Sequence, residues 1–269
     1  NVGIAICEPY VGFSNYKSVE VEGVAIMVEP FSDEYLEIMK CRKIPVETMK
    51  KLPSPMNLIK VVVTNIDYLD SELKKEGFSN RQHLERKEAE SEVKSAHKWN
   101  MDYDAAINYW LKRDKTTARV KETVLKEKIE SYIKAHNTCS LATGTTEKIR
   151  NTPIEYNYID GYFYFFSEGG LKFKGLKENK NVSIAIYEPY SGFSSLKSVR
   201  ADGIASMIEP FSDEYLKILE YKKVPVEMLK KLEHPMNLIK VAVKSFDYLD
   251  SDFNKEGFGY RQHLKGWTS

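Results

Sequence analysis

The hydrophobic pattern along the chain changes from helical to strand-like near residue 137. Upstream of it, apolar residues recur at helical spacing over 102–113, where Ala106, Tyr109 and Trp110 fall near one face, and again over 120–135. Downstream of it, short runs rich in β-branched and aromatic residues follow one another. The pattern predicts two amphipathic helices followed by a series of strands.

The strand region also carries clear turn and capping signals. Ile159-Asp160-Gly161 separates two apolar runs, and an Asp-Gly pair between such runs predicts a tight hairpin. Ser212 precedes two acidic residues, which is the pattern of a helix start. The order predicts a mainly β fold, a mostly antiparallel barrel with flanking helices. Its expected strands are 138–143, 149–158, 162–167, 182–187, 198–208 and 238–249, and its expected helices are 171–179, 213–222 and a short one between Pro225 and Pro235.

Much of this pattern occurs twice. Residues 1–84 (copy 1) align without a gap with residues 181–264 (copy 2) at an offset of about 180, and roughly two thirds of the positions are identical. A repeat this long exceeds the periods of roughly 20–50 residues found in solenoids and propellers, so it indicates a domain duplication. The predicted organisation is the C-terminal half of a barrel module at 1–84, a charged helix or linker at 85–100, a complete module at 101–264 and a tail at 265–269.

Copy 1 lacks a counterpart of the stretch 101–180. A barrel without half of its strands would have unpaired strand edges and an open core, which is an unstable arrangement. We expect either that the sequence is part of a longer natural chain or that copy 1 takes strands from another chain, and we favour the first.

Composition excludes several classes of function. Of the 269 residues, 42% are apolar and 29% are charged, and the formal net charge is +1, which gives no electrostatic case for binding nucleic acid or an anionic membrane. No run of about 18 apolar residues is present, so we expect no transmembrane helix.

Cysteine and histidine positions indicate neither disulfides nor a metal centre. Cys7 and Cys41 align with tyrosines in copy 2, while Cys139 lies in an apolar run and is expected to be a small buried hydrophobe. This usage favours a reducing, cytoplasmic compartment. No pair of histidines has metal-ligand spacing, so we predict no metal site.

The candidate chemistry lies in the part that occurs once. Arg150, Asn151 and Thr152 share one predicted strand, whereas Ser167, two glycines, Lys172 and Lys174 lie at a strand-to-helix turn. Glycines there let backbone N–H groups approach an anion, and the basic side chains complete a phosphate cradle. The spacing alone favours a simpler interpretation, a solvated basic helix after a glycine turn.

The stretch from Leu141 to Pro210 resembles the pyridoxamine 5′-phosphate oxidase-like family of FMN-binding split barrels. The matching pieces are LAT (141–143), RNTPIEYNYIDGYFYFFSEGG (150–170), LKFKGLKENKNVSIAI (171–186) and SVRADGIASMIEP (198–210). The resemblance implies an FMN-binding split barrel, here a tandem duplication with an incomplete first copy.

The resemblance also implies which residues hold the cofactor. Arg150 and Lys172 match the phosphate-binding residues of the family, Lys174 aligns with a further basic position, and Leu171 stands where the oxidase has an arginine. Ser167 matches a hydroxyl near the flavin, and Ser198 replaces a glutamine that contacts it. Backbone groups of Asn151, Thr152 and Pro153 are expected along the polar edge of the ring. Phe166 belongs to an aromatic run that could stack on the ring, although such runs more often form core.

The end of the last strand carries a further match. FGYRQHL resembles the Arg-x-His element with which the oxidases reach their substrate, and it places Arg261 and His263 at a substrate or interface position. Copy 1 keeps the element as Arg81 and His83. The alternative is that these side chains only tie down the C-terminal tail.

These observations lead to three functional hypotheses. The first is an FMN-dependent oxidoreductase, of the nitroimidazole-reductase-like branch, that reduces a small aromatic or nitro compound with electrons from NADH or NADPH. The second is a non-catalytic flavin- or haem-binding protein, and the third a module with a vestigial site. The redox chemistry would belong to the flavin, so we assign no catalytic side chain. A homodimer or an intrachain pseudo-dimer of the two copies is expected, with one flavin.

Overall fold

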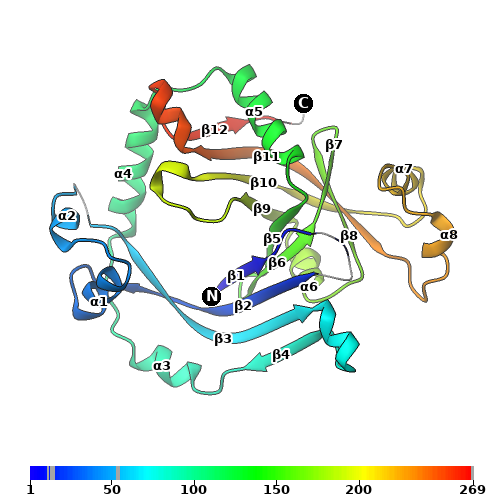
Figure 1. The fold of residues 1–269 in the computed structure, drawn as a ribbon, viewed down its shortest axis with the longest axis horizontal. Helices are drawn as coiled ribbons and strands as arrows, with labels where there is room; N and C mark the ends of the chain where they lie inside the picture. The colour runs from blue at the N-terminus through cyan, green and yellow to red at the C-terminus, as the bar shows by residue number, and fades with distance from the viewer. Residues whose placement is uncertain (11, 13–15, 53–54, 268–269) are drawn as a thin grey trace.

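The chain forms two β-sheets, one from copy 1 and one from the complete module (Figure 1). The computed structural model describes residues 1–10, 12, 16–52 and 55–267. The copy 1 sheet has the order β1-β2-β3-β4, and its strands are β1 (Val2–Cys7), β2 (Lys17–Val28), β3 (Leu58–Asp70) and β4 (Arg81–Glu85). The larger sheet has the order β6-β5-β9-β10-β11-β8-β7, with β12 paired to β11.

The complete module begins with two helices and continues in strands, as its sequence pattern predicts. The helices are α4 (Tyr103–Thr116) and α5 (Glu122–Lys134). The sheet curls so that β6 approaches β8, and α5 packs its apolar face against the inside of the curl. The strands are β5 (Thr138–Gly144), β6 (Ile149–Glu155), β7 (Asn157–Ile159), β8 (Tyr162–Ser167), β9 (Asn181–Tyr187), β10 (Lys197–Ile208), β11 (Asn237–Asp250) and β12 (Arg261–Lys265).

The turn and the helix cap that the sequence predicts are present in the structure. The turn between β7 and β8 has positive φ at both Asp160 (51°) and Gly161 (84°), as a two-residue hairpin turn requires. The backbone N–H of Tyr215 donates to Ser212 Oγ, which caps α7. The helices of this region are α6 (Lys172–Glu178), α7 (Asp213–Tyr221) and α8 (Val226–Leu229), joined by the short 3₁₀ segments η2 (Phe193–Ser195) and η3 (Ser251–Glu256).

Copy 1 reproduces the geometry of copy 2. The β2–β3 pair has a bulge at Glu22/Gly23, and the β10–β11 pair has one at the equivalent Asp202/Gly203. Copy 1 also contains α1 (Asp33–Cys41), α2 (Val46–Lys50) and η1 (Ser71–Glu76). In Figure 1, α1 and α2 lie at one end of the molecule and their counterparts α7 and α8 at the other.

Two features differ from the sequence pattern. The predicted strand 149–158 is divided into β6 and β7 at Tyr156, whose hydroxyl donates to the backbone oxygen of Ile133 (2.6 Å). The Arg-x-His elements form the strands β4 and β12, which were not among the expected strands. The charged segment 85–100 contains one short helix, α3 (Ala89–Ser95), and the last two residues of the tail lie outside the described part.

The main hydrophobic core belongs to the complete module alone. It joins α5 and the inward side chains of β5 and β8–β12, and it includes Cys139, which is buried as expected. The described residues of copy 1 form only a small cluster under α1, built around Tyr35 and Met39. The sheet of copy 1 is therefore held mainly by what it packs against.

Candidate functional site

Strand β6 of the complete module forms the contact with copy 1. It pairs with β5 at one edge of the larger sheet, and it packs across β1 and β2 of copy 1. The approach is close at Gly3, where an added Cβ would lie 3.0 Å from the backbone nitrogen of Asn151. Asn151 also donates toward the Gly3 carbonyl oxygen (3.5 Å) and accepts from Ser140. The residues predicted on this strand therefore lie at an interface.

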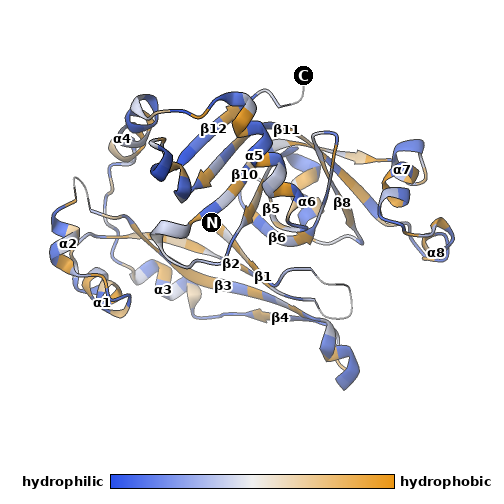
Figure 2. Cartoon of the chain, turned by 45° about the horizontal axis from the view of Figure 1, so that its top comes forward, coloured by the Kyte–Doolittle hydropathy of each residue, from blue (hydrophilic) through white to orange (hydrophobic). Residues whose placement is uncertain are grey.

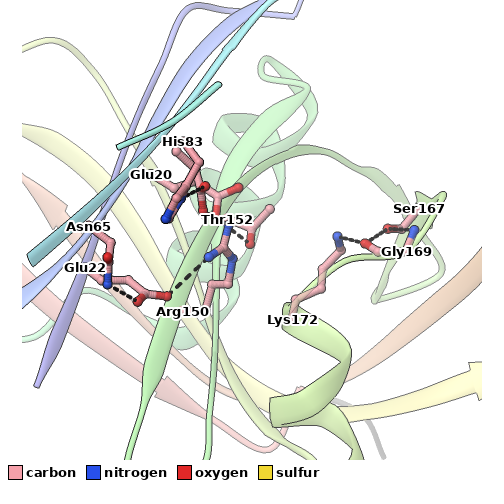
Figure 3. A network of polar contacts seen from close by, with 10 residues as sticks. Glu20, Glu22, Asn65, His83, Arg150, Thr152, Ser167, Gly169 and Lys172 are labelled. Carbon is pink, nitrogen blue, oxygen red and sulfur yellow. Dashed lines mark hydrogen bonds and ion pairs between the residues drawn. The ribbon is translucent and has the colours of Figure 1, made fainter. Parts of the chain in front are cut away.

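Arg150 lies among three carboxylates of copy 1 (Figure 3). Its guanidinium is 2.7 Å from Glu20, 3.2 Å from Glu22 and 2.6 Å from Asp67, and the Arg150 side chain is only 12% exposed. Thr152, on the same face of β6, bonds Glu20 at 3.5 Å. We call Glu20, Glu22, Asp67 and Arg150 the inter-copy charge cluster.

The charges in this cluster have opposite effects on two carboxyl groups. Burial alone would raise the pKa of Asp67, but hydrogen bonds from Arg150 and His83 lower it below its usual range. Burial raises the pKa of Glu20, although Arg150 and Lys172 act against this. Asp67 therefore remains ionised and joins Arg150 to His83 (2.8 Å).

Copy 2 has the opposite charge at the position equivalent to Glu20. Glu20 corresponds to Arg200, which pairs with Asp202 and Asp247 of its own sheet and is mostly exposed. The three carboxylates of copy 1 belong to no motif in the sequence. The charge reversal between Glu20 and Arg200 was the signal that could have found one of them.

The glycine turn after β8 holds a buried cation. Lys172 is 8% exposed and donates from Nζ to the Gly169 carbonyl oxygen (2.5 Å), which also accepts from Ser167 (Figure 3). Within the described part of the chain it forms no ion pair. Burial, together with the charges of Arg81 and Arg150, lowers the pKa of Lys172 to about 8.

Arg81 of copy 1 reaches the same turn. Gly170 has φ of 101°, and a Cβ built there would lie 3.7 Å from Lys172 Nζ and 3.9 Å from Arg81 Nη1. One cation from copy 1 and one from the complete module therefore meet over one glycine. Like charges so placed favour an anion between them.

The remaining predicted residues lie apart from this pair. Pro153 is buried opposite Ser140, and Lys174 is exposed on α6. Phe166 packs edge-on against Tyr215 of α7, in a second apolar cluster. Ser198 lies on β10 opposite Tyr187 and Leu249.

The Arg-x-His element of copy 2 is covered by α4. The guanidinium of Arg261 lies 5.2 Å from the Trp110 ring centroid, and His263 pairs with Asp247 (2.7 Å). A cavity of about 220 Å³ between α4 and this element is lined by Arg113, Tyr260 and Arg261 among others. The equivalent Arg81 instead lies near the glycine turn of the complete module.

A substitution at Gly259 should test how tightly α4 is seated. A Cβ there would lie 2.0 Å from Thr117 Cγ2, whereas copy 1 has Ser79 at this position. Gly259→Ser should lower the free energy of unfolding by about 1–3 kcal/mol because the connection after α4 must move. Ser79→Gly is the matched control and should change it by less than about 1 kcal/mol. Equal effects in denaturant titrations would contradict this packing.

No three His, Cys, Asp or Glu residues in the described ranges come together as a metal site. None of the helices built from those residues is both long enough and apolar enough to cross a bilayer.

Comparisons with known proteins give structural likenesses only. No family model matches the chain, and no curated protein matches it. Campylobacter jejuni ChuZ is 16% identical, with 76% of each chain covered and a TM-score of 0.44. HutZ from Vibrio cholerae, described as a heme storage protein, is 18% identical over 47% of this chain and 92% of its own, with a TM-score of 0.38. A putative pyridoxamine 5′-phosphate oxidase from Listeria innocua is 17% identical over 46% of this chain and 98% of its own, also with a TM-score of 0.38.

The larger sheet is antiparallel and curled, with α5 packed against it, which agrees with the mainly β barrel with flanking helices that the sequence pattern predicts.

Proposed function

We propose that the chain binds FMN between copy 1 and the complete module, with the phosphate held by Lys172 and Arg81, and acts as an oxidoreductase on a small aromatic or nitro compound. One observation carries the proposal. A buried lysine from the complete module and an arginine from copy 1 meet over an open glycine turn.

The residues present fit a phosphate group, in a way that differs in part from the family pattern. Gly169 and Gly170 both have positive φ, and an added Cβ on Gly169 would meet no atom within 4 Å, so an anion can approach the backbone there. Arg150 is already neutralised by three carboxylates. Its expected contact with the phosphate stays a prediction.

The inter-copy charge cluster would position the arginine of this site. Arg150 forms an ion pair with Asp67, and Asp67 in turn pairs with His83. His83 and Arg81 point to the same side of β4 because they are two residues apart on that strand. Bound flavin would supply the transfer of electrons between a nicotinamide and the substrate. The role of the chain is to bind and orient the flavin, with Arg81 contributed by copy 1 and Lys172 by the complete module.

A haem-binding function is the second candidate, and His83 supports it. Asp67 bonds Nδ1 of His83, which leaves Nε2 as the nitrogen available to a ligand, and a carboxylate-oriented histidine is typical of metal-binding imidazoles. Arg81 and Lys172 could then pair with the carboxylates of the porphyrin.

The predicted cytoplasmic location and the dimeric state also stay predictions.

Titration of the apoprotein with FMN and, separately, with hemin tests the proposal. We expect FMN fluorescence to be quenched at a ratio of one flavin per chain, and the holoprotein to oxidise NADH or NADPH when a nitroaromatic acceptor is added. A Soret band with hemin and no quenching of FMN would instead support the second candidate. Binding of neither would contradict both.

The affinity for FMN should depend on pH through Lys172. Its pKa in the free protein is about 8, so the ammonium is present below that value and is lost as the pH rises through it. We expect FMN affinity to be constant just above neutral pH and to weaken as the pH rises from about 8 to 9. Lys172→Arg should remove this dependence, because a guanidinium stays charged throughout. An identical pH profile in both proteins would contradict the assignment.

A further inference from the structure

One face of the copy 1 sheet is apolar and exposed, and Figure 2 shows hydrophobic segments along its strands. The exposed side chains are Ile4 (38%), Ile6 (58%), Ile59 (58%) and Leu84 (62%), which we call the open face. The opposite face of the same sheet carries Ala5, Glu20 and Glu22 and packs on β6. Soluble proteins rarely expose a contiguous apolar surface of this kind.

Copy 2 shows what covers this face. The positions equivalent to the open face are Ile184, Ile186, Ile239 and Leu264, and none of them is more than 5% exposed. They pack against side chains from a single stretch of the chain that copy 1 lacks, namely Leu125, Ile129 and Ile133 of α5, Leu141 of β5, and Phe163 and Phe165 of β8.

The two sheets match closely enough for the same occupant. Their strand registers agree, including the bulges, and the four residue pairs just compared at the face are identical. We propose that the open face binds a protein segment with the residue pattern of 101–180, an amphipathic helix followed by antiparallel strands with inward aromatic side chains.

The strand edges of copy 1 favour this occupant over a second copy of the chain. In copy 2, β9 pairs with β5 and the first half of β11 pairs with β8. Among the described residues of copy 1, β1 pairs only with β2, and β3 pairs with β4 only over Asn65–Leu69. Two open faces stacked on each other would bury apolar side chains but would give the first half of β3 no further strand partner, whereas the proposed segment supplies one.

A chain extended by a second copy of residues 101–180, fused directly to Asn1, tests the proposal. The junction reproduces the natural Lys180–Asn181 junction, because Asn1 corresponds to Asn181. We expect amide hydrogen exchange in β1 and β3 to slow by at least about tenfold, toward the rates of β9 and β11, and binding of the dye ANS to fall. The control carries Ile129→Glu and Phe163→Glu in the added copy only, and should exchange as fast as the unextended chain.

Two outcomes would overturn the proposal. One is exchange in β1 and β3 that is equally fast with and without the added segment. The other is an unextended chain that is dimeric by light scattering and already protected in β1 and β3, which would assign the open face to a second copy.

Discussion

Replacing Arg150 by leucine should lower the free energy of unfolding by about 3–5 kcal/mol and loosen copy 1 from the complete module. The loss follows from the inter-copy charge cluster, in which one guanidinium neutralises three partly buried carboxylates. Without it, Glu20, Glu22 and Asp67 face each other and a leucine, and their desolvation is no longer offset. Urea titrations followed by circular dichroism measure the effect.

The repeat supplies the matched control for this substitution. Arg200→Leu removes an arginine from the equivalent surface of copy 2, where its side chain is 58% exposed, and should cost less than about 1 kcal/mol. Glu20→Gln combined with Arg150→Leu should recover part of the loss, because one of the repelling charges is gone. An Arg150→Leu protein as stable as Arg200→Leu would show that the cluster does not hold the copies together.

Replacing Lys172 by alanine should weaken FMN binding roughly 10- to 100-fold, the effect of one charge-assisted hydrogen bond. Lys172 is the buried cation of the glycine turn; burial lowers its pKa, and the charge of Glu20 offsets this only in part. A bound phosphate would supply that compensation. Fluorescence titration of the apoprotein gives the two dissociation constants.

Lys174 is the control on the same helix, two residues away and exposed. Lys174→Ala should leave FMN affinity within about twofold of the unchanged protein, because a solvated charge contributes little. Equal losses in the two variants would mean that general positive charge, rather than the turn itself, attracts the flavin.

The strands, hairpin and caps could be predicted because their signals are local. Asp160-Gly161 fixes a turn by backbone conformation alone, and Ser212 caps a helix through the next residues in the chain. The repeat likewise is visible in the sequence, and the two copies carry bulges at equivalent positions. The division of 149–158 was missed because it depends on Tyr156 meeting α5, a tertiary contact.

Only those residues of the site that belong to the complete module could be predicted from the sequence. Lys172 and the glycine turn belong to a continuous motif, so their proximity is visible in the sequence. Arg81 and the three carboxylates come from copy 1, more than sixty residues away, and their meeting with β6 depends on how two sheets pack. Arg150 has the predicted place on its strand, but its partners are carboxylates supplied by the other copy.

The central claim is that Lys172 and Arg81 hold an anion between copy 1 and the complete module. The most direct test is the ratio of the dissociation constants for riboflavin and FMN, because these two ligands differ only in the phosphate group. We expect the unchanged protein to prefer FMN by at least about tenfold and Arg81→Ala to lose most of this preference, while Arg261→Ala keeps it. An Arg81→Ala protein with an unchanged preference for FMN would contradict the claim.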